Sequence, residues 1–384
     1  MRRSGHLEQR EPIRLGDPAL SAVAAEALSC TGDVERATHG FHTWPAGLHP
    51  DAAKLLIGAL PGDSVLDPFC GGGTVLVEAQ IAGRRAVGRD VSPVARLVAL
   101  GRTATPDDAL LTRVRSAARK LVAAARTADK APPEPILSAV REWYAPHVGW
   151  ELESLRSGIA ACPADVQPLL WLCFSSILVK TSFRKSDTSA QRVKHDRPRG
   201  TAAVLFHKKV RELGRRLEAL RALVPAGTPP SDVQLADART FTLRQRVDLV
   251  LTSPPYPSTY DYLPMQHLRT VWLGQDAGDG EIGARRYWRA GGADARRQWI
   301  ADTHAWTARA AAATNPGGRL VVVIGDGLTP AAEIDTSGPT EEAAIRAGLV
   351  TIARASVPRP DFARETLRWE HCFVFGRAAG EPVG

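Results

Sequence analysis

The chain has 384 residues, of which 44% are hydrophobic and 23% charged, a composition that supports a large packed core and excludes a disordered or fibrous protein. Its longest apolar run, residues 169–179, is shorter than the roughly 20 residues that cross a bilayer. No apolar segment follows the charged N-terminus, so we expect no secretory signal. The five cysteines are odd in number and form no CxxC pair, so we expect reduced thiols in a cytoplasmic protein, without disulfides or a metal site.

The net charge of +8 is concentrated in one part of the chain. Residues 180–216 contain twelve lysines and arginines against three acidic residues, a local balance of +9, so the remainder is close to neutral. Such a concentration of positive charge indicates a polyanionic partner such as nucleic acid. The alternative is the solvated face of a helix, because residues 210–223 have an amphipathic pattern.

In chain order, a polar arm over residues 1–37 precedes an amphipathic stretch over 51–60. The pattern then predicts a short buried strand over 64–69, a helix over 74–83 and a second strand over 85–90. Ser92 and Pro93 are suited to the N-cap and the first position of the next helix. This alternation of strands and helices is typical of a parallel sheet.

From residue 103 to residue 230 the sequence predicts mainly helices, interrupted by a loop over 182–200 that lacks apolar periodicity. Strand patterns resume at 233–238, 247–254, 319–327, 349–357 and 367–377. Seven strands, several almost wholly apolar, predict an α/β fold with a mostly parallel sheet covered by helices on both faces. We expect four segments: the arm (1–37), the first part of the sheet domain (38–102), a basic helical insertion (103–230) and the second part of the sheet domain (231–384).

A glycine-rich corner follows the first predicted strand, in the sequence DPFCGGGT at residues 67–74. Glycines let the backbone turn tightly and approach a ligand, and the following helix offers unpaired N–H groups. The spacing is not the GxGxxG of dinucleotide enzymes, which disfavours a nicotinamide oxidoreductase. Asp90 ends the second strand, where an acid can bind ribose hydroxyls, and Asp237 ends the third, within reach of an adenine amine. Each aspartate could instead be a helix-capping or turn residue.

Five motifs carry a family resemblance: FHTWPAGLHP, DPFCGGGT, GRDVSP, LADAR and TSPPY, in this order. They resemble the motifs of S-adenosylmethionine-dependent amino-methyltransferases that act on DNA bases, over about residues 38–99 and 233–377. The resemblance implies a Rossmann-like class I methyltransferase fold, with the helical insertion between the second and third strands, S-adenosylmethionine as cofactor and DNA as partner. The residues that it places at the cofactor are Phe41, Pro45, Asp67, Pro68, Phe69, Gly71, Gly73, Thr74, Asp90 and Asp237.

The resemblance also implies a role for each part of that cofactor site. Phe69, Gly71 and Gly73 would line the methionine end of the cofactor, with Asp67 close by. Asp90 would bind the ribose and Asp237 the adenine, and residues 41–50 would close over the molecule.

The corner Ser253-Pro254-Pro255-Tyr256 suits the methylation of an exocyclic base amine. Such an amine is a poor nucleophile because its lone pair is delocalised into the ring. The Ser253 hydroxyl and the Pro254 carbonyl can accept its two N–H groups and expose the lone pair, and proline holds that carbonyl rigidly. Tyr256 can stack on a base that is swung out of its helix. The alternative is a Pro-Pro turn that merely ends a strand.

Serine at the first position resembles the cytosine-N4 branch more than the adenine-N6 branch. We therefore expect a DNA cytosine-N4 methyltransferase. The alternatives are an adenine-N6 enzyme, an RNA base amino-methyltransferase, or a nucleic-acid-binding protein of this fold that has lost catalysis. Tyr260 and Tyr262 could contact the nucleotide or simply pack, and His371 is expected to be structural.

The helical insertion is the predicted target-recognition region, with the loop at 182–200 as its contact surface. Its basic side chains would mainly meet phosphates, which give affinity with little sequence specificity. The residues expected to bind nucleic acid are Lys180, Arg184, Lys185, Arg192, Lys194, Arg197 and Arg199.

Overall fold

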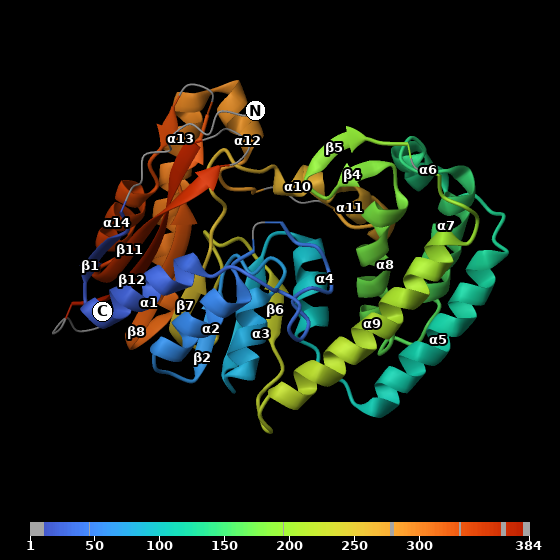
Figure 1. The fold of residues 1–384 in the computed structure, drawn as a ribbon, viewed down its shortest axis with the longest axis horizontal. Coiled ribbons are helices and arrows are strands. Elements are labelled where there is room, and N and C mark those ends of the chain that lie inside the picture. The colour runs from blue at the N-terminus through green and yellow to red at the C-terminus, as the bar shows by residue number, and fades with distance from the viewer. Residues whose placement is uncertain are drawn as a thin grey trace, which may run out of the picture.

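The structure is a computed structural model that describes residues 11–45, 47–194, 196–276, 280–329, 332–361 and 366–378. Among these residues, eight strands form one sheet in the order β1-β11-β12-β8-β7-β2-β3-β6 (Figure 1). The strands are β1 (Ile13–Gly16), β2 (Ser64–Asp67), β3 (Arg85–Asp90), β6 (Asp232–Leu235), β7 (Val247–Thr252), β8 (Thr314–Gly325), β11 (Leu349–Asp361) and β12 (Thr366–Arg377).

The direction of the strands confirms the predicted fold class. Strands β6, β3, β2, β7 and β8 pair in parallel, whereas β12 is antiparallel to both β8 and β11. Without β1, the remaining seven strands have the order and the single reversed strand of a class I methyltransferase. The seven strands expected from the sequence are these seven.

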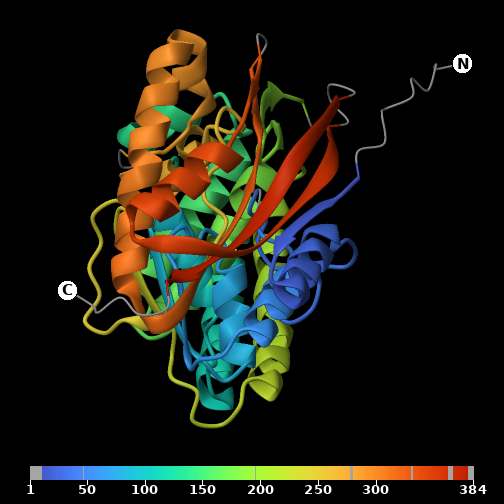
Figure 2. The ribbon, with the colours of Figure 1, turned by 90° about the vertical axis from the view of Figure 1, so that its left-hand side faces the viewer.

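Helices cover both faces of the sheet, because alternate residues of each strand point to opposite sides. Val65, Leu249 and Leu251 pack toward one face with α1 (Pro18–Ser29), α2 (Pro50–Ala59) and α3 (Thr74–Ile81). Leu66 and Val250 pack toward the other face with α13 (Gly292–Ala313) and α14 (Ser337–Arg346). Figure 2 shows the two layers on either side of the strands. The shorter elements are α4 (Pro93–Arg102), α10 (Tyr262–Met265), α11 (His267–Leu273), α12 (Arg285–Ala290), β9 (Gly327–Leu328) and β10 (Glu333–Ile334).

The chain between β3 and β6 folds into a separate group of helices beside the sheet, which we call the helical lobe (Figure 1). It comprises α5 (Asp108–Arg126), α6 (Glu134–Val140), α7 (Pro146–Ala160), α8 (Gln167–Thr181) and α9 (Thr201–Leu223). Its core is continuous with the inner side of α4 and α11, so the lobe is packed firmly against the sheet domain. The bounds of the four segments expected from the sequence stay predictions.

Glu151 of α7 holds the start of the longest helix of the lobe. Its side chain is buried and accepts hydrogen bonds from the backbone amides of Gly200, Ala202 and Ala203 at 2.6, 2.9 and 3.2 Å. These amides have no carbonyl partner within their own helix, and the carboxylate also opposes the positive end of the helix dipole. The sequence around the start of α9 does not reveal this cap, because Gly200 at the N-cap has no side chain. The capping carboxylate of Glu151 comes from another helix, α7.

Two parts of the secondary structure differ from the sequence prediction. The polar arm contains strand β1, which pairs with β11, and helix α1, which Asp17 caps through a bond from the Leu20 amide at 2.9 Å. The loop at 182–200 contains a short hairpin of β4 (Arg184–Ser186) and β5 (Ser189–Arg192). Such short strands carry too little apolar alternation to be predicted, and β1 in addition pairs with a strand more than 300 residues away. In the part of the chain that the structure describes, no helix has the length and apolarity to cross a membrane.

Candidate active site

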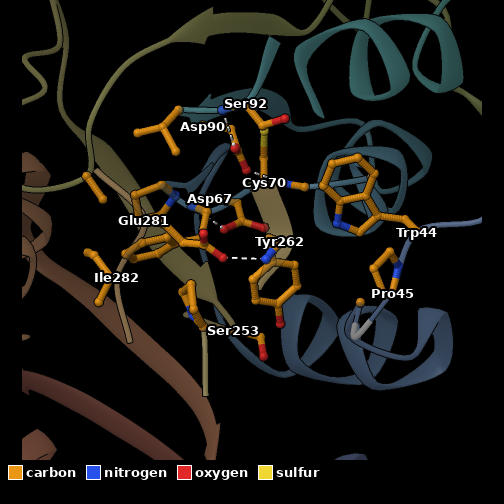
Figure 3. A pocket seen from close by; sticks show the side chains of 18 of the residues that line it. Trp44, Pro45, Asp67, Cys70, Asp90, Ser92, Ser253, Tyr262, Glu281 and Ile282 are labelled. Atoms are coloured by element: carbon orange, nitrogen blue, oxygen red, sulfur yellow. Dashed lines mark hydrogen bonds between the residues drawn. The ribbon is translucent and has the colours of Figure 1, made fainter. Parts of the chain in front are cut away.

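A cavity lies at the carboxyl ends of β2, β3, β6 and β7, where parallel α/β sheets bind their ligands. It encloses about 980 Å³ of empty space, part of it open to solvent, and Figure 3 shows how its side chains converge. We call it the cofactor cavity. The sequence-predicted residues that line it are Pro45, Asp67, Pro68, Phe69, Gly71, Thr74, Asp90, Asp237, Ser253 and Pro255. The glycine corner and the Ser-Pro-Pro corner therefore share one cavity, although about 180 residues separate them in the chain.

The glycine corner needs glycine for two physical reasons. Gly71 and Gly73 have φ values of 45° and 78°, which side chains with a Cβ rarely adopt. A Cβ at Gly71 would also lie 2.6 Å from Nε1 of Trp44, whose ring covers this turn. Asp90 stabilises the turn, because its Oδ2 accepts the Gly71 amide at 2.9 Å.

Two carboxyl groups of the cofactor cavity are held in unusual electrostatic states. Asp67 Oδ1 accepts the Thr252 hydroxyl at 2.7 Å and the Phe69 amide at 3.0 Å, and burial raises the pKa of this carboxyl to about 7. Burial likewise raises the pKa of Asp90 to about 6, although hydrogen bonds from the Ser92 and Gly71 amides oppose the shift. Among the residues that the structure describes, no cation stabilises the ionised form of either group. A positively charged ligand in this cavity would supply one.

Asp237 reaches the cavity but is already paired. Its carboxylate receives Nε and a terminal nitrogen of Arg239, the latter at 2.6 Å, and Arg239 also contacts Asp302 at 2.9 Å. This pairing lowers the pKa of Asp237 against the effect of burial. A carboxylate oxygen can accept more than one hydrogen bond, so Asp237 keeps capacity for an adenine amine.

The segment that was expected to close over the cofactor is anchored in the helical lobe. Phe41 is buried away from the cofactor cavity, its carbonyl bound by Lys209 Nζ at 2.9 Å, so the structure does not support its predicted cofactor contact. His42 Nε2 lies 3.0 Å from the Ser175 hydroxyl of α8. Pro45 and Trp44 do line the cofactor cavity. The segment thus joins the lobe to the glycine corner.

The corner at 253–256 splits between two environments. Ser253 and Pro255 face the cofactor cavity, whereas Pro254 is buried. Tyr256 does not line this cavity; its hydroxyl donates to Glu370 Oε1 of β12 at 2.8 Å. Burial, together with Glu370, raises the pKa of Tyr256 well above its ordinary value, so the hydroxyl remains a donor.

Two residues of the site, Arg102 and Glu281, carry no motif and were missed in the sequence. Trp44 covers the glycine turn, and Arg102 binds both the Gly72 carbonyl at 2.7 Å and the Thr38 carbonyl at 3.0 Å. Glu281 accepts the backbone amide of Tyr262, and the Tyr262 side chain lines the cavity (Figure 3). Trp44 belongs to the FHTWPAGLHP motif, whereas the roles of Arg102 and Glu281 arise only from the packing.

The basic residues predicted to meet phosphates divide into two groups. Arg184 is buried and donates to the Met265 carbonyl at 2.8 Å, so it stabilises the fold. Arg197 is half-buried. The side chains exposed on the helical lobe are Lys180, Lys185, Arg192, Lys194 and Arg199. In the same hairpin Asp187 pairs with Arg269 of α11, so the β4–β5 hairpin is docked on the segment that follows the Ser-Pro-Pro corner.

Comparison with known proteins identifies part of this site. Residues 44–132 match the family model of the RMKL-like methyltransferase domain. The tRNA (guanine(10)-N2)-dimethyltransferase of Methanothermobacter thermautotrophicus is 41% identical over 51 residues, which is 12% of this chain and 15% of the relative. The chain thus spans only a small part of the curated relative that it matches.

Two solved structures of methyltransferases resemble this chain weakly. TrmN from Thermus thermophilus has 13% identity and a TM-score of 0.33, with 86% of this chain and 48% of that chain covered. The rRNA methyltransferase aviRa from Streptomyces viridochromogenes has 13% identity and a TM-score of 0.35, with 90% of both chains covered. At these values neither likeness carries an argument about substrate or partner.

The assignment to the DNA amino-methyltransferases is therefore wrong. The family model and the curated relative are both methyltransferases of another kind, and the relative is named for a tRNA base. The motifs misled because a glycine corner and a Pro-Pro-aromatic corner serve cofactor binding and amine chemistry, whatever polymer carries the base.

Residues 44–132 are similar to a methyltransferase domain, and S-adenosylmethionine is the cofactor expected for such a domain. The family model covers the glycine corner and Asp90, and the residues present fit this cofactor. Two buried carboxyl groups with raised pKa values, Asp67 and Asp90, suit a ligand that carries a sulfonium and an ammonium group. The glycine turn provides the close backbone approach, and Phe69, Val91 and Ile282 offer apolar surface for a purine ring.

Proposed function

We propose that this protein methylates an exocyclic amino group of a base in RNA, with N2 of guanine in tRNA as the first candidate. The observation that carries the proposal is that Ser253 and Pro255 line the same cavity as the glycine corner. The match to a tRNA guanine-N2 methyltransferase supports RNA as the substrate and N2 as the acceptor.

The cofactor, when bound, supplies a methyl group on a positively charged sulfur, and the charge is neutralised as the methyl leaves. The chain's own residues prepare the acceptor. The Ser253 hydroxyl and the Pro254 carbonyl accept the two N–H groups of the amine and turn its lone pair toward the cofactor cavity. With the cofactor bound, a C–N bond would form as the C–S bond breaks, and the excess proton on the methylated nitrogen would pass to water. The fixed φ of Pro254 and Pro255 keeps the acceptors in place, so most of the rate gain comes from alignment.

The helical lobe offers a surface for the RNA backbone. Its exposed side chains Lys185, Arg192 and Lys194 lie on or beside the β4–β5 hairpin. This hairpin contacts α10 and α11 through Arg184 and Asp187. Because Tyr262 of α10 lines the cofactor cavity, phosphates bound at the hairpin would lie near one side of this cavity.

The test measures which polymer and which base receive the methyl group. The protein is incubated with methyl-labelled S-adenosylmethionine and, separately, tRNA, rRNA and duplex DNA, and the products are digested to nucleosides and identified by mass spectrometry. We expect N2-methylguanosine from RNA. Pro254→Ala should abolish most of the label, whereas Pro225→Ala, on an exposed turn after α9, should not. Label in DNA alone, or in no nucleic acid, would contradict the proposal.

A further inference from the structure

A second cavity adjoins the cofactor cavity on the other side of Ser253. We call it the acceptor cavity; it encloses about 840 Å³ of empty space, part of it open to solvent. Gly47, Leu48 and Ser253 line both cavities, so together they form the wall between them. A group in the acceptor cavity would therefore reach the cofactor past the Ser253 hydroxyl.

An aromatic ring, apolar side chains and one ion pair line the acceptor cavity. Ala27, Leu28 and Val34 of the N-terminal arm and Val323 of β8 supply apolar surface, and Tyr256 supplies the ring. Such a mixture of apolar walls with few polar groups is typical of a site for a small planar ligand. It also explains why Tyr256 turns away from the cofactor cavity.

The polar group of this cavity is a carboxylate held between two donors. Glu370 Oε1 accepts the Tyr256 hydroxyl at 2.8 Å, and Oε2 accepts Arg359 Nε at 2.7 Å. These two contacts fix the carboxylate relative to the ring. Since each carboxylate oxygen has two lone-pair sites, Glu370 can still accept from a ligand in the cavity.

His49 also borders the cavity, and its Nδ1 accepts the Asp51 amide at 3.2 Å. Its Nε2 is buried and, among the described residues, has no hydrogen-bond partner. The cavity therefore combines one strong acceptor, Glu370, with the donor Arg359.

This combination distinguishes the three bases that carry an exocyclic amine. Beside its amine, guanine presents the N1–H donor, whereas adenine presents the bare N1 and cytosine the bare N3. A carboxylate attracts the N–H of guanine and repels the lone pairs of the other two bases. The O6 of guanine, next to N1, would find a donor in Arg359. Leaving a buried partner unsatisfied is strongly penalised, so such a site rejects the wrong base.

We infer that the acceptor cavity binds the base to be methylated and that Glu370 selects guanine by accepting its N1–H while N2 lies at Ser253. The inference rests on the proposed function, because it names the base on which that function acts.

Glu370→Gln is the decisive variant, since it keeps the size of the side chain and replaces one acceptor oxygen with an N–H donor. The substrate is total tRNA, and the readouts are the methylated nucleoside formed, its rate, and the S-adenosylmethionine affinity from tryptophan fluorescence. We expect N2-methylguanosine to form at least 100-fold more slowly, with unchanged cofactor affinity. Glu342→Gln, on the exposed face of α14, is the matched control and should be silent.

A second variant separates contact with the base from support of the ring. Tyr256→Phe removes the hydroxyl that Glu370 accepts but leaves both the ring and the carboxylate. We expect a loss of less than tenfold. If Tyr256→Phe is as slow as Glu370→Gln, the carboxylate acts only through the tyrosine and the inference is wrong.

The remaining outcomes separate the inference from the proposed function. If the wild type forms 6-methyladenosine or 4-methylcytidine in RNA, or if Glu370→Gln still forms N2-methylguanosine within threefold of the wild type, the inference fails while amine methylation of RNA stands. If the wild type binds the cofactor but methylates no RNA nucleoside, the proposed function itself fails.

Discussion

Cofactor binding should release protons from the two buried carboxyl groups of the cofactor cavity. In the free protein, burial raises the pKa of Asp67 to about 7 and that of Asp90 to about 6. A cationic ligand favours their ionised forms and lowers both pKa values. Because the free protein holds more protons than the complex, binding weakens as pH falls.

The size of the effect follows from the two pKa values. At pH 6.5 the pair holds about one proton in the free protein, about three quarters of it on Asp67. Binding should therefore release about one proton at pH 6.5, and the Kd should rise about tenfold from pH 7 to pH 6. The amino group of the cofactor stays mostly protonated in this range, because such groups have a pKa of about 7.7 to 8.0.

Isothermal titration calorimetry measures the released protons directly. Titrations at pH 6.5 in buffers with different ionisation enthalpies give the proton number from the slope of the observed heat. Asp67→Asn keeps the oxygen that accepts from Thr252 and Phe69, and it should reduce the release to about 0.2 proton, the share of Asp90. Equal heats in all buffers, together with a Kd that is flat between pH 6 and pH 7, would refute this reasoning.

Three further predictions test the catalytic corner, the lobe surface and the fold. Tyr256→Ala and Pro254→Ala should lower turnover far more than S-adenosylmethionine affinity, whereas Asp90→Ala should do the reverse; comparing kcat with Kd for each variant checks this, and the opposite pattern would exchange the proposed roles. Reversal of Lys185, Arg192 and Lys194 to glutamate should weaken tRNA binding and flatten its dependence on salt, while reversal of Arg346 on α14 should not; an unchanged slope in a filter-binding titration would leave the basic stretch as a solvated surface. Glu151→Ala leaves three amides of α9 without their acceptor and should lower the free energy of unfolding by about 3 kcal/mol or more. Glu153→Ala, which breaks a partly exposed pair with Arg156, should cost less than about 1 kcal/mol in the same urea titration.

The sequence by itself determined the sheet and the position of its chemistry. Apolar runs such as 247–252 are read correctly because a strand buried on both faces needs apolar residues throughout. Parallel strands bring their carboxyl ends to one edge, so the glycine corner and Ser253 were expected at the same edge of the sheet, and the pairing of β2 with β7 makes them neighbours there. The missing GxGxxG spacing disfavoured a dinucleotide cofactor, and S-adenosylmethionine was implied by the family resemblance alone.

The choice of polymer was beyond what these motifs encode. Cofactor and amine impose the same geometry whether the base belongs to DNA or RNA, so the corner at Ser253 could not separate them. RNA entered the proposed function through the relative that is named for a tRNA base.

Only the tertiary structure decided which side chains complete the site. Tyr256 meets Glu370 across 114 positions of sequence, and Trp44 lies over Gly71 although nothing in the spacing brings them together. The β4–β5 hairpin and strand β1 likewise owe their form to partners far along the chain. A local sequence pattern predicts the secondary structure of a segment when the backbone and the apolar face of that segment determine its conformation. A pocket is fixed by hydrogen bonds and packing between segments, and these exist only when the whole chain has folded.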